Sequence, residues 1–304
     1  KRAAWAKRVE ADQKAVVFLG DSITQGWGDN VGGSFPTLKV ANRGISGDTT
    51  RGMLVRLADD VLKLQPTGVV MLMGTNDLEE GADAATIAGN VQLILESLKT
   101  YNAKMPITLC RVFPASASKK RPADQIKAIN AAIAEIARNY AQVTVVDTWT
   151  LFADDKGDAK PAEFPDLLHP NQAGYVKWAA AIRPVLATQG LLETEDDSFQ
   201  VEPGFMSLLN GKDLSGWRLA ATKTKPAEES LDGRTATSDG RYVAMHGRIV
   251  VTTPSEGSRI QQLYTKQEFA GDFVLKLEFR ATPNADSGVF IRGPQLQCRD
   301  YPLA

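Results

Sequence analysis

Short apolar runs alternate with longer amphipathic segments through roughly the first 150 residues, and few folds accommodate this alternation. The apolar runs are rich in β-branched side chains, as expected for strands that are covered on both faces. Four of them are predicted as strands: Ala15 to Leu19, Val69 to Met73, Ile107 to Val112 and Val143 to Val146. A shorter run, Leu38 to Ala41, is a candidate fifth strand.

The segments between these runs carry apolar residues at spacings of three or four, which is typical of helices that pack on one face. The apolar positions are Leu54, Leu57 and Val61, then Ile87, Val91, Ile94, Leu95 and Leu98, then Ile126, Ile129, Ile133, Ile136 and Tyr140. Strands that alternate with helices form right-handed βαβ units and a parallel, doubly wound α/β sheet. Ligands bind such a sheet in the crevice outside the carboxyl ends of its strands.

Several classes of function are disfavoured by missing motifs. No Gly-x-Gly-x-x-Gly and no Gly-x-x-x-x-Gly-Lys-Ser/Thr follows a predicted strand, so the usual dinucleotide and P-loop phosphate sites are not expected. The Gly-x-Ser-x-Gly elbow of α/β-hydrolases is also absent. Another arrangement of a nucleophilic serine stays open.

The composition of the chain limits which binding partners and cofactors are expected. Hydrophobic residues make up 43% and charged residues 23% of the chain, and 35 basic against 36 acidic side chains give a net charge of −1. These values indicate a globular protein and no surface for nucleic acid. No apolar run reaches the roughly 18 residues of a membrane span. The chain has two cysteines and two histidines, Cys110, Cys298, His169 and His246, which are too few and too scattered for a zinc site, so no zinc is expected. Two free buried thiols are favoured over a disulfide.

Polar segments follow the predicted strands where a doubly wound sheet places its ligand. They are Gly20 to Thr24, Asn42 to Asp48, Gly74 to Asp77 and, in the loop after the last strand, Asp166 to Pro170. Because the carboxyl ends of parallel strands meet at one edge, the four segments are expected to converge on one crevice.

Four short motifs in and beside these segments resemble, in order, the four sequence blocks of the SGNH, or GDSL-type, hydrolase superfamily. They are Gly20-Asp21-Ser22, Gly47-Asp48-Thr49-Thr50, Gly74-Thr75-Asn76-Asp77 and Asp166-x-x-His169-Pro170. The resemblance spans about residues 14 to 190. It is strongest to the branch that contains platelet-activating-factor acetylhydrolase catalytic subunits and bacterial carbohydrate acetylesterases. It implies a flavodoxin-like three-layer α/β/α domain and a serine esterase that needs no cofactor.

The residues themselves suggest how such an esterase would work. A serine hydroxyl needs a neighbouring base, and His169 is the only histidine of this domain. Asp166, three residues earlier, can hold the other ring nitrogen of the imidazole. Ser22 is therefore the candidate nucleophile, His169 the candidate base and Asp166 its orienting carboxylate.

Three groups are expected to bind the oxyanion that forms during acyl transfer: the backbone amides of Ser22 and Gly47 and the side-chain amide of Asn76. Removing one such donor costs about 10² to 10³ in turnover. Activity on p-nitrophenyl acetate should rise at about pH 6 to 7, where an ordinary imidazole loses its proton.

Each of these residues also has a structural interpretation. A serine after a strand is by default a helix cap, an asparagine a turn residue and a histidine before proline a surface residue. The combination of these residues in this order favours a catalytic site.

Further polar and aromatic residues near these segments have alternative roles. Asp21 and Asp77 are expected to hold their loops through hydrogen bonds to the backbone, although Asp21 stays a candidate substrate contact. Arg111 faces either the crevice or a scaffold carboxylate. Trp27 is a packing residue or lines the substrate site, and the same choice applies to Trp178.

The pattern changes after about residue 203. Residues 272–280 alternate Phe273, Leu275, Leu277 and Phe279 with residues that are mainly charged, which predicts a strand with one face on a core. Asn210-Gly211, His246-Gly247 and Ser287-Gly288 are predicted turns. A β-sandwich or jelly roll is the expected class.

Three strings in this part resemble the 3-keto-disaccharide hydrolase family, a concanavalin-like jelly roll. They are Leu209-Asn210-Gly211-Lys212-Asp213-Leu214-Ser215-Gly216-Trp217, Asp272-Phe273-Val274-Leu275, and Asn284-Ala285-Asp286-Ser287-Gly288-Val289-Phe290. The resemblance covers residues 203–304, about the first half of that domain, so the β-sandwich is expected to be partial. Either further strands lie outside this sequence or another chain completes the sheets. Arg280, Ser287 and Arg292 are candidates for sugar contact, with a structural role equally open, whereas His246 is expected to be a solvated turn residue.

These observations predict an esterase domain at residues 1–190, an acidic linker at 191–202 and a partial β-sandwich at 203–304. The expected function is hydrolysis of acetyl esters on a small-molecule or polysaccharide substrate, outside the bacterial cytoplasm. A lipid or phospholipid acetylhydrolase is the first alternative, and a glycan-binding protein with an ancillary esterase domain is the second. The oligomeric state is left open.

Overall fold

The computed structural model describes residues 1–192, 201–223, 225–238, 241–245, 247–251, 261–279, 281 and 286–299. Most of the acidic segment, residues 193–200, lies outside the described residues. The chain divides into two compact units, one of Lys1–Leu192 together with Phe279–Ala304 and the other of Glu193–Glu278. The domain boundaries drawn from the sequence stay a prediction.

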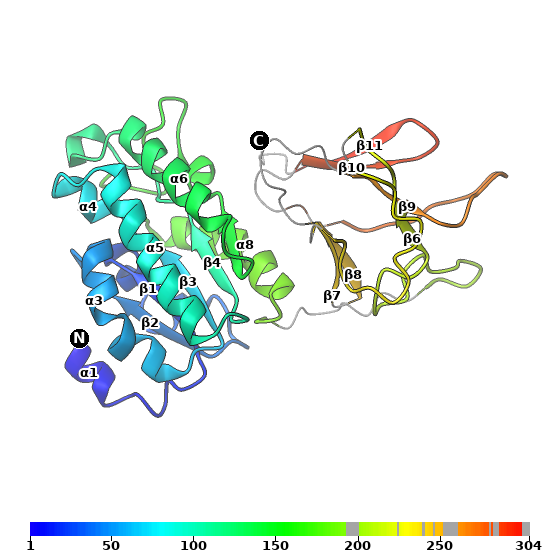
Figure 1. Ribbon diagram of the computed structural model, residues 1–304. Coiled ribbons are helices and arrows are strands. Elements are labelled where there is room, and N and C mark those ends of the chain that lie inside the picture. The colour runs from blue at the N-terminus through cyan, green and yellow to red at the C-terminus, as the bar shows by residue number, and fades with distance from the viewer. Residues whose placement is uncertain are drawn as a thin grey trace. The chain divides into compact units, whose positions relative to one another are not determined.

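Five parallel strands form the sheet of the α/β part (Figure 1). They are β1 (Val16–Gly20), β2 (Val40–Gly44), β3 (Gly68–Leu72), β4 (Ile107–Cys110) and β5 (Val143–Val146), in the spatial order β2-β1-β3-β4-β5. This is the flavodoxin-like order, in which the winding direction reverses between β1 and β3. The predicted parallel α/β sheet is confirmed, and the candidate fifth strand forms as β2, which begins at Val40 rather than Leu38.

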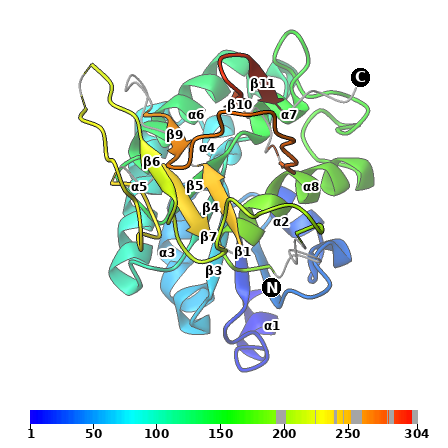
Figure 2. The same cartoon turned by 90° about the vertical axis from the view of Figure 1, so that its right-hand side faces the viewer.

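Helices cover both faces of the sheet. The long ones are α3 (Thr50–Asp60), α5 (Ala84–Tyr101), α6 (Ala123–Ala137) and α8 (Gln172–Thr188). The short ones are α1 (Arg2–Ala6), α2 (Ser22–Gly26), α4 (Thr75–Glu79) and α7 (Thr148–Phe152), with 3₁₀ turns η1 (Val31–Gly33), η2 (Leu62–Leu64) and η3 (Ala117–Lys119). In Figure 2 the strands lie between α3 and α5 on the left and α2 and α8 on the right. Every helix in the described part of the chain is too short or too polar to cross a bilayer.

Alternate residues of each strand contribute to two separate cores. In β1, Val17 and Leu19 pack in the core that includes apolar residues of α3, α5 and α6. Val16 and Phe18 pack in the core that includes residues of α2 and α8. Successive strand side chains point to opposite faces, so a sheet covered on both sides needs the continuous apolar runs seen in the sequence.

Two glycines allow α2 to lie directly over the strand ends. A Cβ on Gly44, the last residue of β2, would lie 2.2 Å from the backbone nitrogen of Gln25 in α2. A Cβ on Gly20, the last residue of β1, would lie 2.1 Å from Thr24 Oγ1. Since side chains cannot approach so closely, only glycine at these two positions permits this packing.

The C-terminal part is β-rich and antiparallel. Its described strands are β6 (Trp217–Leu219) paired with β9 (Leu263–Thr265), β7 (Tyr242–Met245) paired with β8 (Arg248–Val251), and β10 (Asp286–Phe290) paired with β11 (Gln295–Arg299). Leu214, Leu219 and Leu231 form a small core with Trp217 and Leu263 packed against it. These small sheets agree with the predicted β-rich class.

The predicted strand at residues 272–280 is wrong over its described part. No strand is present at residues 272–279, and Phe273 and Phe279 are 41% and 54% exposed. A period-two pattern shows which face of a strand could be buried, but a strand also needs a neighbour for its backbone hydrogen bonds. None of the described strands pairs with this segment.

The predicted turn at Ser287-Gly288 is also wrong, because both residues lie inside β10. The chain turns instead after β10, where the amide of Ile291 donates to the carbonyl of Pro294 at 2.9 Å. A Cβ on Gly288 would lie 2.1 Å from Gln295 Nε2 on β11, so this glycine serves a close cross-strand approach rather than a turn.

Candidate active site

Ser22 is the first residue of α2, and only Asp21 separates it from the end of β1. The preceding Asp21 caps this helix, since its Oδ1 accepts a hydrogen bond from the amide of Ile23 at 2.9 Å. This is the loop-holding bond expected from the sequence. Ser22 Oγ lies 3.0 Å from His169 Nε2 although the two residues are 147 positions apart in the chain.

Asp166 and His169 form one compact turn. Asp166 Oδ1 accepts from the amides of Leu168 and His169 at 3.0 and 2.7 Å, and Oδ2 lies 2.7 Å from His169 Nδ1. Between them Leu167 adopts a φ of 61°, a left-handed conformation that is uncommon for such a side chain. The structure therefore brings together all three residues that the sequence assigned to acyl transfer.

The protonation states follow from these contacts. Partial burial alone would raise the pKa of Asp166, but the hydrogen bonds from the side chain and amide of His169 and the amide of Leu168 outweigh it and lower the pKa to about 2. The carboxylate is ionised at neutral pH and can only accept, so the proton of a neutral imidazole sits on Nδ1. Nε2 is then free to accept from the Ser22 hydroxyl.

Helix α8 links the histidine turn to the serine helix. Asn171 caps α8, because its Oδ1 accepts from the amide of Gly174 at 3.0 Å. One turn later Tyr175 donates its hydroxyl to the carbonyl of Ile23 in α2 at 2.8 Å. The segment that follows His169 is thus fastened to the helix that begins with Ser22.

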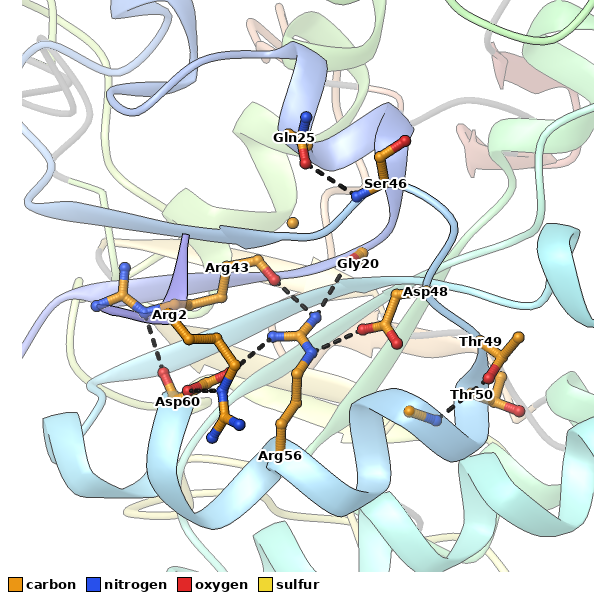
Figure 3. A network of polar contacts seen from close by, with 12 residues as sticks. Arg2, Gly20, Gln25, Arg43, Ser46, Asp48, Thr49, Thr50, Arg56 and Asp60 are labelled. Atoms are coloured by element: carbon orange, nitrogen blue, oxygen red, sulfur yellow. Dashed lines mark hydrogen bonds and ion pairs between the residues drawn. The ribbon is translucent and has the colours of Figure 1, made fainter. Parts of the chain in front are cut away.

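The loop after β2 is held beside α2 and presents Gly47. The amide of Ser46 donates to Gln25 Oε1 in α2 at 2.9 Å (Figure 3). Gly47 itself has a φ of 79°, which favours glycine. Within residues 1–192, all of them described, the backbone amides of Ser22 and Gly47 donate to no protein acceptor. Both remain available to a substrate.

Arg56 of α3 ties this loop to the sheet, as Figure 3 shows. Its Nε donates to Asp48 Oδ2 at 2.6 Å, and its Nη2 donates to the carbonyls of Gly20 and Arg43 at 3.1 and 2.8 Å. The residue is 4% exposed. One buried guanidinium therefore joins the ends of β1 and β2 to the residue that follows Gly47, a role that sequence reasoning missed.

Asn76 lies in the first turn of α4 and is buried. Its Nδ2 donates to the carbonyl of Asp48 at 2.9 Å, which leaves a second N–H on the same nitrogen. Its neighbour Asp77 accepts from the amide of Thr50 at the start of α3. Asp77 thus holds a loop, as expected, and Asn76 belongs to a helix rather than to a turn.

Asp21 is buried, and its second carboxylate oxygen has no hydrogen-bond partner in residues 1–192. Burial raises the pKa of this carboxyl to about 7, although the amide of Ile23 and the nearby imidazole of His169 lower it. The sequence suggested Asp21 as a candidate substrate contact, but its complete burial makes direct contact difficult.

The two other candidate substrate contacts, Trp27 and Arg111, make structural contacts within the domain instead. Trp27 is 4% exposed and stacks on Trp178 with ring centroids 4.2 Å apart. Both tryptophans are therefore packing residues. Arg111 forms an ion pair with Asp147 at 2.9 Å, so it faces a scaffold carboxylate, the second of its two alternatives.

The candidate sugar contacts of the C-terminal part stay untested. Ser287 lies in β10, and Arg292 follows that strand with a φ of 53°. Arg280 and His246 lie outside the described residues.

The α/β/α fold, with Ser22, His169 and Asp166 beside the strand ends, defines a hydrolase of the SGNH class. Residues 18–177, more than half of the chain, match the model of the GDSL-like lipase/acylhydrolase family, and the chain belongs to this family. Residues 204–302 match the model of the 3-keto-alpha-glucoside-1,2-lyase-like domain. Both resemblances drawn from the sequence are confirmed.

Individual relatives match the first part of the chain. Platelet-activating factor acetylhydrolase IB subunit alpha2 of Homo sapiens is 29% identical over 190 residues, which cover 60% of this chain and 80% of that protein. Subunit alpha1 of Mus musculus is 25% identical over 190 residues, covering 59% and 79%. A GDSL-like lipase structure from Bacteroides thetaiotaomicron is 27% identical in sequence and superposes with a TM-score of 0.55. The match covers 62% of this chain and 97% of that lipase.

Proposed function

We propose that the protein is a serine esterase that transfers an acyl group to Ser22 and then to water. The observation that carries this proposal is the pair of contacts at His169, whose Nε2 lies 3.0 Å from Ser22 Oγ and whose Nδ1 lies 2.7 Å from Asp166. An imidazole held in this tautomer can remove the serine proton as the hydroxyl attacks an ester carbonyl.

In the first half-reaction Ser22 Oγ bonds to the carbonyl carbon, and its proton passes to His169 Nε2. The tetrahedral intermediate then collapses, the bond to the alcohol breaks, and the imidazolium gives its proton to the departing alcohol oxygen. In the second half-reaction His169 deprotonates a water molecule as it attacks the acyl-enzyme. The bond between the acyl carbon and Ser22 Oγ then breaks, and the imidazolium returns its proton to Ser22 Oγ as the carboxylic acid leaves. Asp166 stabilises the imidazolium in both halves.

The negative charge on the intermediate needs hydrogen-bond donors. The free amides of Ser22 and Gly47 and the second N–H of Asn76 are the donors we assign to it. The short ties of Ser46 to Gln25 and of Asn76 to Asp48 support this assignment, because they hold the Gly47 loop between the serine helix and α4.

We further propose that the substrate is an acetyl ester on a carbohydrate. Two observations support this choice: the relatives named as acetylhydrolases, and the match of residues 204–302 to a domain named for a glucoside-cleaving enzyme. A polysaccharide substrate would also place the protein outside the cytoplasm. The same relatives favour a second candidate, an acetylated phospholipid, because their name specifies platelet-activating factor.

The chemistry is tested with p-nitrophenyl acetate. The Ser22→Ala variant should lose hydrolysis by at least about 10⁴-fold, since no other step can replace the acyl-enzyme. Ser97→Ala removes a serine from the exposed side of α5 and should leave turnover unchanged. Residual turnover of Ser22→Ala near that of the wild type would overturn the proposal.

The substrate is tested by acetate release from acetylated xylan, sugar acetates and an acetylated phospholipid in parallel. A higher kcat/KM on the sugar esters supports the carbohydrate assignment, and a higher value on the lipid supports the second candidate. Retention of the protein on polysaccharide with negligible ester hydrolysis would instead favour a glycan-binding protein.

A further inference from the structure

Arg121 is a buried cation that contacts the candidate oxyanion residue Asn76. It follows the 3₁₀ turn η3 and its side chain is 3% exposed. Its Nη2 donates to Asn76 Oδ1 at 2.9 Å and to Glu79 Oε2 at 2.8 Å. Its Nε donates to the carbonyl of Thr75 at 3.0 Å and its Nη1 to the carbonyl of Lys119 at 2.6 Å. The guanidinium therefore holds helix α4 through three hydrogen bonds, one of which goes to Asn76.

This contact determines which way the Asn76 amide points. A guanidinium has only donors, so the atom facing it must be the carbonyl oxygen Oδ1 and not the NH₂ group. On the other side, the carbonyl of Asp48 can only accept, so it selects Nδ2. A reversed amide would place two donors together at Arg121 and two acceptors together at Asp48.

The same contact should strengthen Asn76 as a donor. A hydrogen bond from a cation to Oδ1 is roughly twice as strong as a neutral one, and it draws electron density away from the amide nitrogen. Hydrogen bonds in a chain polarise one another, and the effect is larger where water is excluded. Arg121, the Asn76 amide and a developing oxyanion would form such a chain.

We propose that Arg121 is a positioning residue that orients and polarises the Asn76 amide for oxyanion binding. This inference rests on the proposed function, because it assumes that Asn76 binds the oxyanion. Arg121 forms no hydrogen bond with Ser22, and its contact with the candidate oxyanion site is the one to Asn76. The rival interpretation is that Arg121 merely fastens the η3 loop to α4, in which case its loss would affect folding but not the transition state.

A double-mutant cycle between Arg121 and Asn76 separates these roles. Arg121→Lys keeps the charge but loses the planar set of donors. We expect it to lower kcat on p-nitrophenyl acetate by about 10- to 100-fold with KM changed less than about threefold, as for an interaction made in the transition state. In the Asn76→Ala background the same change should lower kcat by less than about threefold, because the group through which Arg121 acts is gone.

Arg43→Lys is the matched control for a purely structural arginine. Arg43 is also buried, donating to two backbone carbonyls and forming an ion pair with Asp12 at 2.7 Å. It should lower the thermal midpoint by an amount comparable with Arg121→Lys while kcat stays within about threefold of the wild type. If Arg121→Lys does not fold, Arg121→Gln, which keeps an N–H donor without the charge, takes its place in the cycle.

A second readout is the affinity of a trifluoromethyl ketone that forms a hemiketal oxyanion with Ser22. Its affinity should fall with Arg121→Lys by the same factor as kcat/KM, and not with Arg43→Lys. Equal losses of kcat in both Asn76 backgrounds, or unchanged affinity for the ketone, would overturn the role of Arg121 while leaving the esterase intact. Failure of the proposed function gives a different result, namely a Ser22→Ala variant that still hydrolyses the ester.

Discussion

At the residue scale, Asp166 serves two purposes at once. One carboxylate oxygen closes the turn by accepting two backbone amides, and the other holds the imidazole. The turn that the carboxylate stabilises is therefore the one that aims the histidine at Ser22. The hydrogen bonds that depress the pKa of Asp166 also keep it ionised across the pH range in which an imidazole acts as a base.

Asp21 predicts a pH-dependent stability. Burial raises its pKa from 3.8 to about 7, so between these pH values the folded state binds more protons at this site than the unfolded state does. Stability contributed by the protonated carboxyl is present below about pH 4 and is lost as the pH rises through about 7. The asparagine side chain in the Asp21→Asn variant does not titrate. The thermal midpoint of the variant minus that of the wild type should therefore increase from pH 5 to pH 8.

Asp83→Asn is the control for this measurement. Asp83 also caps a helix, accepting from the amide of Thr86 at 2.8 Å, but its pKa is lowered by that bond. It stays ionised in both states from pH 5 to pH 8, so the difference between Asp83→Asn and wild type should be constant. A constant difference for Asp21→Asn as well would contradict a raised pKa at Asp21.

At the scale of elements, the close packing of α2 on the strand ends explains why glycines end β1 and β2. A Cβ on Gly44 would meet the backbone of Gln25, which cannot rotate away as a flexible side chain could. The position of Ser22 thus depends on the absence of two side chains, a feature that sequence reasoning can read as a motif but not as a contact.

Gly44→Ala should therefore lower both stability and kcat. Overpacking of this kind typically costs about 1–3 kcal/mol, and the displaced helix carries Ser22 away from His169. Gly89→Ala, in the interior of α5 with no atom within 4 Å of the new Cβ, should instead stabilise the protein by about 0.5–1 kcal/mol. Urea unfolding and hydrolysis assays on both variants check this. Equal stabilities of the two variants would refute the close approach at Gly44.

The elements also show where sequence reasoning succeeds. The parallel strands and long helices were predictable because burial on both faces leaves long runs of apolar residues with a period of two or 3.6. Residues 272–279 carry an equally clear period-two pattern but form no strand. The difference is that β1, β3 and β4 each lie between two neighbours, whereas an alternating pattern says nothing about the presence of a pairing partner.

At the scale of the whole molecule, the described apolar cores do not share residues. The two cores of the α/β sheet are formed only by residues between Val9 and Leu192, and the small C-terminal core by residues between Leu214 and Leu263. Each described core is built within one stretch of the chain.

A fragment of residues 1–192 should therefore fold and hydrolyse p-nitrophenyl acetate with kcat within about threefold of the full chain. All candidate catalytic and oxyanion residues lie in it. Circular dichroism and the hydrolysis assay provide the measurement, with Ser22→Ala in the fragment as the blank. A fragment that is unfolded, or folded but inactive, would show that the remaining residues complete the esterase.

The order of strands, helices and polar segments could be predicted from the sequence, because local periodicity and short motifs depend only on neighbours a few residues away. The contact of Arg121 with Asn76, the hydrogen bond from Arg56 to the carbonyl of Gly20, the ion pair of Arg111 with Asp147 and the packing of Trp27 on Trp178 were not predicted. Each depends on the path of the backbone between residues far apart in sequence, and an arginine in a helix or loop has the same local pattern whether it faces water or a buried amide. The folded sheet settles these contacts, since it brings the separate strand ends to one edge.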